Sequence, residues 1–197
     1  QKELDEYLLM LEEAKKRDHR KLGKELGIYT MDDDVGQGLI MWMPNGTVII
    51  EELEKLAKET ENAGGYKRVV TPHIAKESMY LTSGHLPYYA DSMYPPMEMD
   101  GEKYYLKAMN CPGHMLVFGS EVRSYRDLPI RLHEQTALHR NEASGVLSGL
   151  TRVRQFSQDD AHCFVTEGQI GEEVERLIRL VQRVYGDFDL PFTAKLG

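Results

Sequence analysis

A strict alternation of side-chain character between positions 152 and 162 constrains the fold of this chain more than any other feature. The even positions carry the larger and more varied functional groups, and in order they are Arg152, Arg154, Phe156, Gln158, Asp160 and His162. Residues two apart share one face of a β-strand. The pattern therefore predicts strands at 151–158 and 161–165, with one distinctly polar face that also holds an aromatic ring.

The segment before this alternation predicts a partner strand and a flexible connection. Residues 130–140 have the character of a strand, and Arg140 and Glu142, at its end, again share a face. The joining stretch, ASGVLSGLT, is too long for a tight turn and flexible enough to close over a ligand. We therefore expect a strand–loop–strand unit whose polar face continues across both strands.

The remainder of the chain predicts an α+β fold, in which an antiparallel β-sheet is flanked by helices. Amphipathic spacing and capping residues predict helices at 3–17, 18–27, 45–62 and 167–186. Apolar or β-branched runs predict further strands at 38–44, 66–72, 103–108 and 191–196. Residues 82–102, rich in Gly, Pro and Tyr, are expected to form an ordered loop. Strands separated by loops, with few helices between them, are typical of an antiparallel sheet with helices on one side.

Composition and charge limit the classes of protein to be considered. No run approaches the ~18 consecutive apolar residues of a membrane span, and the N-terminus is too charged for a secretory signal. Two cysteines make no disulfide framework, so we expect a cytoplasmic protein. The net charge of −8 argues against non-specific nucleic-acid binding by the whole chain, although a local basic surface remains possible.

The polar face has the chemistry of a site for an anionic ligand that contains an aromatic ring. Arginine grips phosphate or carboxylate with two hydrogen bonds, Phe156 offers a stacking surface, and Glu142 can accept a proton from a base amino group. Neither GxxxxGK[ST] nor GxGxxG occurs, so an ATP site must be built without these loops. From alternation alone, the alternative is an edge strand whose charges keep the sheet soluble.

Three motifs resemble one enzyme family. The stretch HRNEASGVLSGLTRVRQFSQDDAHCF (139–164) looks like motif 2 of the class II aminoacyl-tRNA synthetases, and GYKRVVTP, ending at Pro72, resembles their motif 1. TSGH (82–85) and KAMNCPGH (107–114) narrow the similarity to the threonyl-tRNA synthetases. The resemblance implies the class II catalytic fold in part, with a linker helix at 1–20 and the N-terminal part of the catalytic domain at 21–197.

The resemblance also implies an activity and an ATP site. Such enzymes activate threonine with ATP to threonyl-adenylate and transfer it to the 3′ end of threonine tRNA, with Mg²⁺ as a cofactor. Arg140 would hold the α-phosphate and the amino-acid carboxylate and so act in catalysis. The other ATP-binding roles implied are Arg152 on the γ-phosphate, Glu142 on the adenine amino group and Phe156 stacked on adenine. Arg154 is expected to be structural.

A zinc site and a threonine pocket are implied by the same resemblance. Cys111 and His162 would be two of three protein ligands of Zn²⁺, which recognises the amino and hydroxyl groups of threonine. Asp160, Gln158 and Met109 would line the threonine pocket. His85 would take part in catalysis, by proton transfer to the tRNA. By contrast, His114 is expected to start a turn or helix, and His133 and His139 to be ordinary sheet residues.

The chain departs from the family beyond residue 162. Motif 3 is not found, and no histidine occurs after His162 to serve as the third zinc ligand, so we expect a fragment that alone binds zinc and ATP poorly. The segment ending at Pro72 predicts a homodimer. Two alternatives stay open: a prolyl, seryl or glycyl synthetase, and a non-catalytic synthetase-like regulator that binds RNA or a partner.

Overall fold

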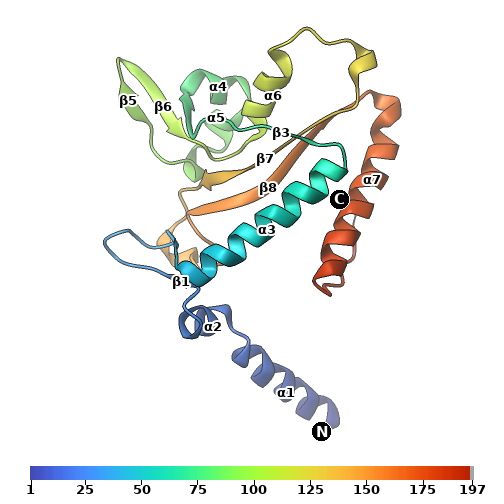
Figure 1. Cartoon of the computed structure of the whole chain (residues 1–197). Helices are drawn as coiled ribbons and strands as arrows, with labels where there is room; N and C mark the ends of the chain where they lie inside the picture. Colours follow the sequence, from blue (N-terminus) through green and yellow to red (C-terminus); the bar gives the residue numbers. More distant parts are fainter. Residues whose placement is uncertain (196–197) are drawn as a thin grey trace.

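The structure, a computed structural model, describes residues 1–195, and a two-stranded ribbon lies at its centre (Figure 1). Strands β7 (Ile130–His139) and β8 (Gln155–Phe164) pair antiparallel over their whole length, from Ile130 opposite Phe164 to His139 opposite Gln155. Strand β3 (Lys67–Arg68) adds to the other edge of β7 in parallel orientation. The part of the polar alternation from Phe156 to His162 therefore belongs to one continuous edge strand.

The ribbon has two faces, because opposed residues of an antiparallel pair point the same way. We call the face that carries the even-numbered side chains of β7 and β8 the front face, and the one with the odd-numbered side chains the back face. Helix α6 (Cys111–Gly119) lies on the front face, where the rings of Phe118 and Phe164 stack 4.0 Å apart. Helices α3 (Pro44–Ala63) and α7 (Ile170–Asp187) cover the back face (Figure 1).

The strand prediction at 151–158 and 161–165 needs one correction. The strand begins only at Gln155, and Arg152 and Arg154 precede it. Arg152 instead pairs with Ser148 in an isolated bridge, and the Arg154 backbone N–H donates to the Gly38 carbonyl at 2.8 Å. The Arg154 carbonyl still accepts from the Arg140 backbone N–H at 2.9 Å, but regular strand pairing ends here because the Arg154 N–H is bonded to a neighbouring loop, which local alternation cannot reveal.

The predicted helices form where their caps and spacing place them. Asp18 caps the second helix by accepting from the Arg20 backbone N–H at 2.8 Å. Thr166 and Gln169 form the expected capping box before α7. The remaining helical bounds are α1 Lys2–Lys16, α2 His19–Glu25, α4 Glu77–Thr82, α5 His85–Tyr88, η1 Ala90–Ser92, η2 Tyr125–Asp127, η3 Ser144–Val146 and η4 Glu167–Gln169.

A smaller sheet packs above the front face. It contains β4 (Ile74–Lys76), β6 (Glu102–Leu106) and β5 (Met97–Met99), all antiparallel in the order β4-β6-β5. Its inner side meets α4 and α5 in a core built from Tyr80, Leu86, Met93, Tyr105 and Ala108. The prediction that 82–102 forms a loop is therefore wrong in part, since this segment contains α5, η1, and β5 with the turn that returns the chain to β6.

Three predicted strands are shorter than expected or do not form. The run 38–44 yields only β2 (Met41–Trp42), paired with β1 (Tyr29–Thr30), and Trp42 is exposed rather than buried. The run 66–72 pairs as a strand only in β3. No strand occurs at 191–195, and residues 196 and 197 of that prediction lie outside the described part of the chain.

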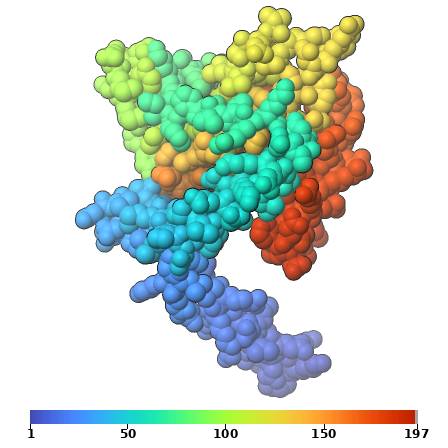
Figure 2. Space-filling model, viewed as in Figure 1, coloured from blue at the N-terminus to red at the C-terminus, as the bar shows by residue number. Residues whose placement is uncertain are grey.

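The N-terminal helix projects from the body of the molecule. No residue of α1 is buried, and the helix extends away from the remainder in both views (Figures 1 and 2). Helix α2 crosses the predicted boundary at residue 20 and touches the body where the Leu150 backbone N–H donates to His19 Nε2 at 3.0 Å. Within residues 1–195, no helix combines the length and apolar character needed to cross a membrane.

Candidate functional site

A buried polar network lies under the front face and fixes the position of its central carboxylate. Glu134 of β7 is fully buried and accepts hydrogen bonds from the Thr71 backbone N–H at 2.7 Å and the Thr71 hydroxyl at 2.8 Å. Lys107 Nζ donates to Glu134 Oε1 at 3.0 Å and to the Thr136 hydroxyl at 2.7 Å. Burial alone would raise the pKa of Glu134, but these donors outweigh it and hold that pKa at about 2.

A chain of hydrogen bonds runs from this carboxylate to the predicted zinc ligand on β8. His114, fully buried at the start of α6, lies 3.2 Å from Glu134 Oε2 through Nε2 and 2.8 Å from His162 Nδ1 through Nδ1. If Nε2–H of His114 donates to the carboxylate, its Nδ1 accepts from Nδ1–H of His162. That assignment leaves the His162 Nε2 lone pair free for a metal, with the ring held in place by a carboxylate–histidine chain.

Cys111 meets the same region from the first turn of α6. The adjacent Asn110 donates from Nδ2 to Asp160 Oδ2 at 3.1 Å, which holds the start of α6 against β8 two residues from His162. Burial, and then the nearby charge of Asp160, raise the pKa of the Cys111 thiol. A thiol that binds a metal cation is deprotonated by it. One thiol and one imidazole are ligand types that suit zinc, but the ligand atoms of Cys111, Asp160 and His162 do not all lie within 4.8 Å of one another in this structure.

The structure brings His85 and Met109 into contact with each other. His85 is buried, its Nδ1 lies 2.8 Å from the Ser83 hydroxyl, and its Nε2 lies 2.9 Å from Met109 Sδ. Burial lowers the pKa of His85, which favours the neutral ring. A neutral imidazole oriented by a hydroxyl is suited to accept or pass on a proton.

The predicted ATP residues gather at the other end of the front face. The Arg140 guanidinium lies over the Phe156 ring, 5.0 Å from its centroid. Arg152 pairs with Glu142 through two contacts, Nε to Oε2 at 3.0 Å and Nη2 to Oε2 at 2.9 Å. These four residues border a hollow of about 420 Å³ whose lining is completed by Leu150, Thr151 and Val153. A nucleotide entering here would have to separate the Glu142–Arg152 pair.

The Arg154 guanidinium, unlike those of Arg140 and Arg152, makes its hydrogen bonds with nearby loops. Its guanidinium donates to the Glu142 carbonyl at 2.9 Å, to the Gln37 carbonyl at 3.2 Å and to the Ser144 hydroxyl at 3.2 Å. With its donors committed to the loop, it ties the 144–154 segment to residues 37 and 38. The expectation that Arg154 is structural agrees with these contacts.

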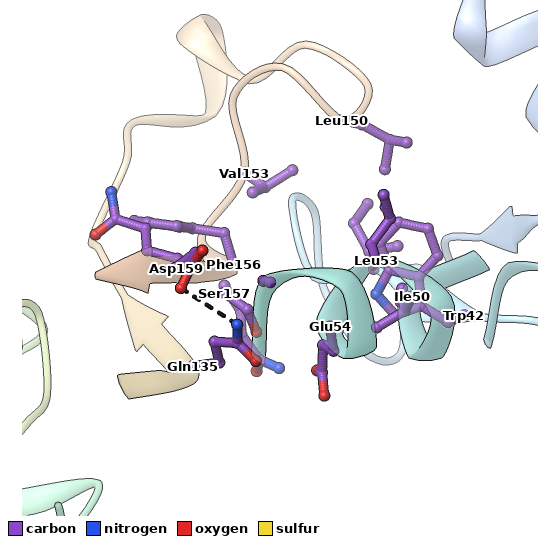
Figure 3. Close-up of a pocket in the computed structure, with 14 residues that line it drawn as sticks. Trp42, Ile50, Leu53, Glu54, Gln135, Leu150, Val153, Phe156, Ser157 and Asp159 are labelled. Atoms are coloured by element: carbon purple, nitrogen blue, oxygen red, sulfur yellow. Dashed lines mark hydrogen bonds between the residues drawn. The ribbon is translucent and has the colours of Figure 1, made fainter. Parts of the chain in front are cut away.

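A second hollow, of about 370 Å³, lies between α3 and β8 (Figure 3). Trp42, Ile50 and Leu53 border it from one side, and Gln135 and Asp159 border it from the back face of the ribbon. Leu150, Val153 and Phe156 line both hollows. The aromatic ring of the predicted ATP site is therefore packed between two open spaces, which sequence alternation did not predict.

The structure places most of the predicted site residues in two groups on the front face. It also shows buried residues that support one of these groups and that the sequence did not single out. Asp160 lies close enough to act electrostatically on Cys111 and is bonded to the adjacent Asn110, whereas Gln158 is exposed on β8. Glu134, Lys107 and His114 form the support beneath them. The buried side chains Glu134 and Lys107 lie 27 positions apart, so no local pattern links them. The strand around Glu134 also carries Arg131, His133 and Gln135, and Lys107 lies just after β6, so the sequence offered no clear signal for this pair.

Known proteins resemble the chain in sequence and in fold. The family model described as "tRNA synthetase class II core domain (G, H, P, S and T)" matches residues 94–196. A threonine–tRNA ligase of Deinococcus radiodurans is 54% identical over 195 residues, covering 98% of this chain and 30% of that protein. One from Halalkalibacterium halodurans is 50% identical over 188 residues, covering 95% of this chain and 29% of that protein. The chain thus spans about 30% of the length of the curated relatives it matches.

Solved structures agree with this assignment of the fold. The RNA binding domain of threonyl-tRNA synthetase from Cryptosporidium parvum Iowa II superposes with a TM-score of 0.84 at 41% identity, over 87% of this chain and 42% of that one. Prolyl-tRNA synthetase of Giardia lamblia, in complex with prolyl-adenylate, superposes with a TM-score of 0.76 at 20% identity, over 85% of this chain and 35% of that one. The second similarity shows the shared fold alone.

Proposed function

Since this chain belongs to the class II tRNA synthetase core-domain family, we propose that it forms part of the catalytic centre of a threonine–tRNA ligase. The protein would activate threonine with ATP to threonyl-adenylate and transfer it to threonine tRNA. One observation carries the proposal: the front face of β8 holds an arginine-capped aromatic ring at one end and, at the other, a histidine bonded to His114 with Cys111 within electrostatic reach of Asp160. We assign the end with Arg140 and Phe156 to ATP and the end with His162 to threonine.

For ATP, Arg140 would bind the α-phosphate and offset the charge that develops when the threonine carboxylate attacks it. Phe156 would stack on adenine after the Arg140 guanidinium has moved off the ring. Separation of the Glu142–Arg152 pair would free the carboxylate for the adenine amino group and the guanidinium for the γ-phosphate. Mg²⁺ would accompany the triphosphate and offset its charge.

For threonine, Cys111 and His162 would hold the zinc ion, which supplies a Lewis-acid position for the amino and hydroxyl groups. Asp160 would accept a hydrogen bond from the threonine hydroxyl, with Met109 and Gln158 bordering the pocket. Valine lacks this hydroxyl and would leave polar groups unpaired, so it would be rejected strongly. His85 would serve the second step, in which a proton leaves the tRNA 3′ end.

The test is threonine-dependent exchange of pyrophosphate into ATP by the gene product that contains this chain. We expect exchange with threonine and very little with valine or proline. Arg140→Ala should reduce the rate by at least about 100-fold, whereas Arg126→Ala, at an exposed η2 arginine, should leave it unchanged. Exchange with proline, serine or glycine in place of threonine would indicate a sister enzyme. No exchange with any amino acid would favour a regulator that binds RNA or a partner.

We also propose that the protein is a cytoplasmic homodimer, joined through the segment that ends at Pro72. Lys67 and Arg68 of β3 are exposed, and the Val70 side chain is 67% exposed, as a subunit contact requires. Sedimentation analysis of Val70→Asp should show a shift toward monomer. An unchanged dimer would place the contact elsewhere.

A further inference from the structure

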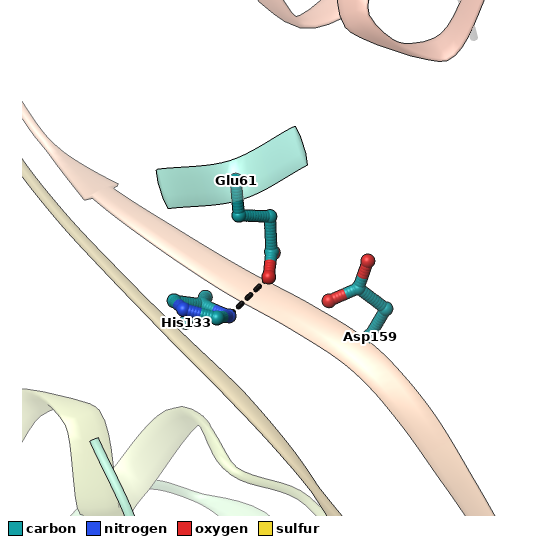
Figure 4. Close-up of side chains that lie close together, drawn as sticks. All are labelled: Glu61, His133 and Asp159. Carbon is teal, nitrogen blue, oxygen red and sulfur yellow. Dashed lines mark ion pairs between the residues drawn. The ribbon is translucent and has the colours of Figure 1, made fainter. Parts of the chain in front are cut away.

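The back face of the ribbon holds a second cluster of ionisable side chains, opposite the front-face site. Glu61 in the last turn of α3, His133 of β7 and Asp159 of β8 point toward one another (Figure 4). One ligand atom from each of the three lies within 4.8 Å of the others. Glu61 is 4% exposed and His133 2% exposed, while Asp159 is solvent-accessible. Three elements far apart in sequence thus converge on one point.

The two buried members of the cluster are not satisfied by protein partners. Glu61 Oε2 and His133 Nδ1 form a close ion-pair contact, yet within residues 1–195 neither atom has a hydrogen bond of acceptable geometry. Buried polar atoms in native proteins are nearly always hydrogen-bonded. Glu61 Oε2 and His133 Nδ1 face each other, and the Asp159 carboxylate lies beside them. A single cation that accepts lone pairs from all three side chains would satisfy them.

Electrostatics at this point favours a cation. Among residues 1–195, no Lys or Arg forms an ion pair with Glu61 or Asp159. Lys58, the nearest lysine on α3, is engaged by Glu54 at 2.8 Å. The last turn of α3 contains no basic residue, so the negative end of the helix dipole adds to the two carboxylates.

A path from solvent and space for further ligands are present. A cavity of about 90 Å³ between α3 and α7 is lined by both Glu61 and Asp159, with Leu56, Leu180 and Val184 among its apolar walls. It is large enough for several waters, since one requires ~10–15 Å³. Gln135 of β7 donates from Nε2 to Asp159 Oδ1 at 3.2 Å and so orients the carboxylate on the neighbouring strand, β8.

We propose that Glu61, His133 and Asp159 form a binding site for a divalent first-row transition-metal ion, with Zn²⁺ as the probe, separate from the zinc site proposed at Cys111 and His162. One imidazole and two carboxylates suit such an ion, whereas Mg²⁺ and Ca²⁺ prefer oxygen ligands only. Water in the adjoining cavity would complete the coordination. The ion would clamp the C-terminal end of α3 onto β7 and β8 and so act as a structural site.

The experiment separates this site from the front-face site by spectroscopy. Co²⁺ is titrated into the 197-residue chain as a coloured substitute for Zn²⁺, and its retention is measured by equilibrium dialysis. Thiolate ligation by Cys111 gives an intense near-ultraviolet charge-transfer band, whereas a site with imidazole and carboxylate ligands gives only weak visible bands. In Cys111→Ser we expect about one equivalent of Co²⁺ retained without the charge-transfer band, and the addition of Zn²⁺ should displace it.

Variants of the cluster decide the outcome. Asp159→Asn changes an exposed side chain and should leave the circular dichroism spectrum native, while affinity for Co²⁺ in the Cys111→Ser background falls by at least about tenfold. His133→Ala should act in the same direction. Glu59→Gln, on the exposed side of the same helix turn, is the matched control and should change nothing. Failure of Cys111→Ser to retain Co²⁺, or equal retention by Asp159→Asn, would overturn the proposal. Neither result depends on aminoacylation activity.

Discussion

The two faces of the β7–β8 ribbon bury similar groups in opposite electrostatic states. On the front face, Glu134 is fully buried and its pKa is held at about 2. On the back face, Glu61 is 4% exposed and its pKa is raised to about 9. Each carboxylate contacts a buried histidine: Glu134 contacts His114 on the front face, and Glu61 contacts His133 on the back face. Depth of burial therefore does not decide the charge of a carboxylate in this molecule.

The difference lies in the number of donors aimed at each carboxylate. Glu134 receives two hydrogen bonds from Thr71, one from the Lys107 ammonium and one from the Thr136 hydroxyl. These donors replace the water that burial removes. Glu61 receives no comparable set from the described residues, and its nearest neighbours are a histidine and another carboxylate. The buried carboxylate of the front face, Glu134, therefore has its hydrogen bonds from the protein itself, whereas that of the back face, Glu61, does not.

The largest expected effect comes from removing the front-face charge. Glu134→Gln leaves the Lys107 ammonium buried without its counter-charge and should lower the free energy of unfolding by about 3–5 kcal/mol, measured by urea denaturation. Glu61→Gln, measured with a chelator present, is the matched change behind the ribbon and should cost less than ~1 kcal/mol, since a neutral amide replaces a protonated acid. Equal losses in the two variants would refute the contrast between the faces.

A second test concerns how closely the start of α3 approaches the segment before β1, in comparison with the start of α7. A Cβ at Gly46, in the first turn of α3, would collide with the Ile28 backbone carbonyl oxygen. We expect Gly46→Ala to destabilise the chain by about 2–3 kcal/mol in thermal or urea unfolding, because backbone cannot move aside as a side chain can. Gly171→Ala, in the first turn of α7, has open space around it and should be neutral or stabilising by up to ~1 kcal/mol. Similar losses in both would exclude the close approach as the cause.

A third test uses the one well-paired carboxylate on the back side. Arg131 donates to Glu173 of α7 from Nε at 2.7 Å and also from Nη2. These bonds from Arg131 lower the pKa of Glu173 below its ordinary value of 4.5. Stability from the pair is therefore present above that value and is lost as pH falls toward the folded-state pKa. Glu173→Gln should cost about 1.5–3 kcal/mol at neutral pH, with the difference from wild type shrinking below about pH 4. A pH-independent difference would contradict it.

The smallest effect on stability is expected at the mouth of the ATP hollow. Arg152 is exposed and paired only with Glu142, so Arg152→Met should change the free energy of unfolding by less than ~0.5 kcal/mol. Arg154→Met removes three hydrogen bonds to the surrounding loop and should cost about 1–2 kcal/mol. Differential scanning calorimetry of the two variants separates a ligand-binding arginine from a structural one. A larger loss for Arg152→Met would reverse the two roles.

Much of the local structure could be predicted because its causes are local. Asp18 caps α2 and Thr166 with Gln169 caps the last helix region, as side-chain chemistry within a few residues requires. The strand from 130 and the front-facing series from Phe156 to His162 are consequences of alternation. The motif resemblance located Cys111 and His85 near that series, although alternation alone could not separate a binding face from a solvated edge.

Predictions failed where contacts between distant segments take over. Arg152 and Arg154 continue the alternation in sequence, but regular pairing ends before them, because the Arg154 N–H donates to Gly38 and Arg152 pairs with Ser148 instead. The run 82–102 has no period, yet a turn at Asp100 and Gly101, both with positive φ, pairs β5 with β6. Whether such a segment pairs depends on its neighbours rather than on its own composition.

The sequence by itself determined the α+β composition, the main helices with their caps, and a polar strand whose motifs resemble the class II synthetases. Only the tertiary structure decided which buried charges are neutralised. His133 carries no local sign that sets it apart from an ordinary sheet residue, and its odd position on β7 became significant only when α3 brought Glu61 over it. The physical reason is that the charge state of a buried group depends on donors and counter-charges within a few ångströms, and in this chain those partners come from segments tens of residues away.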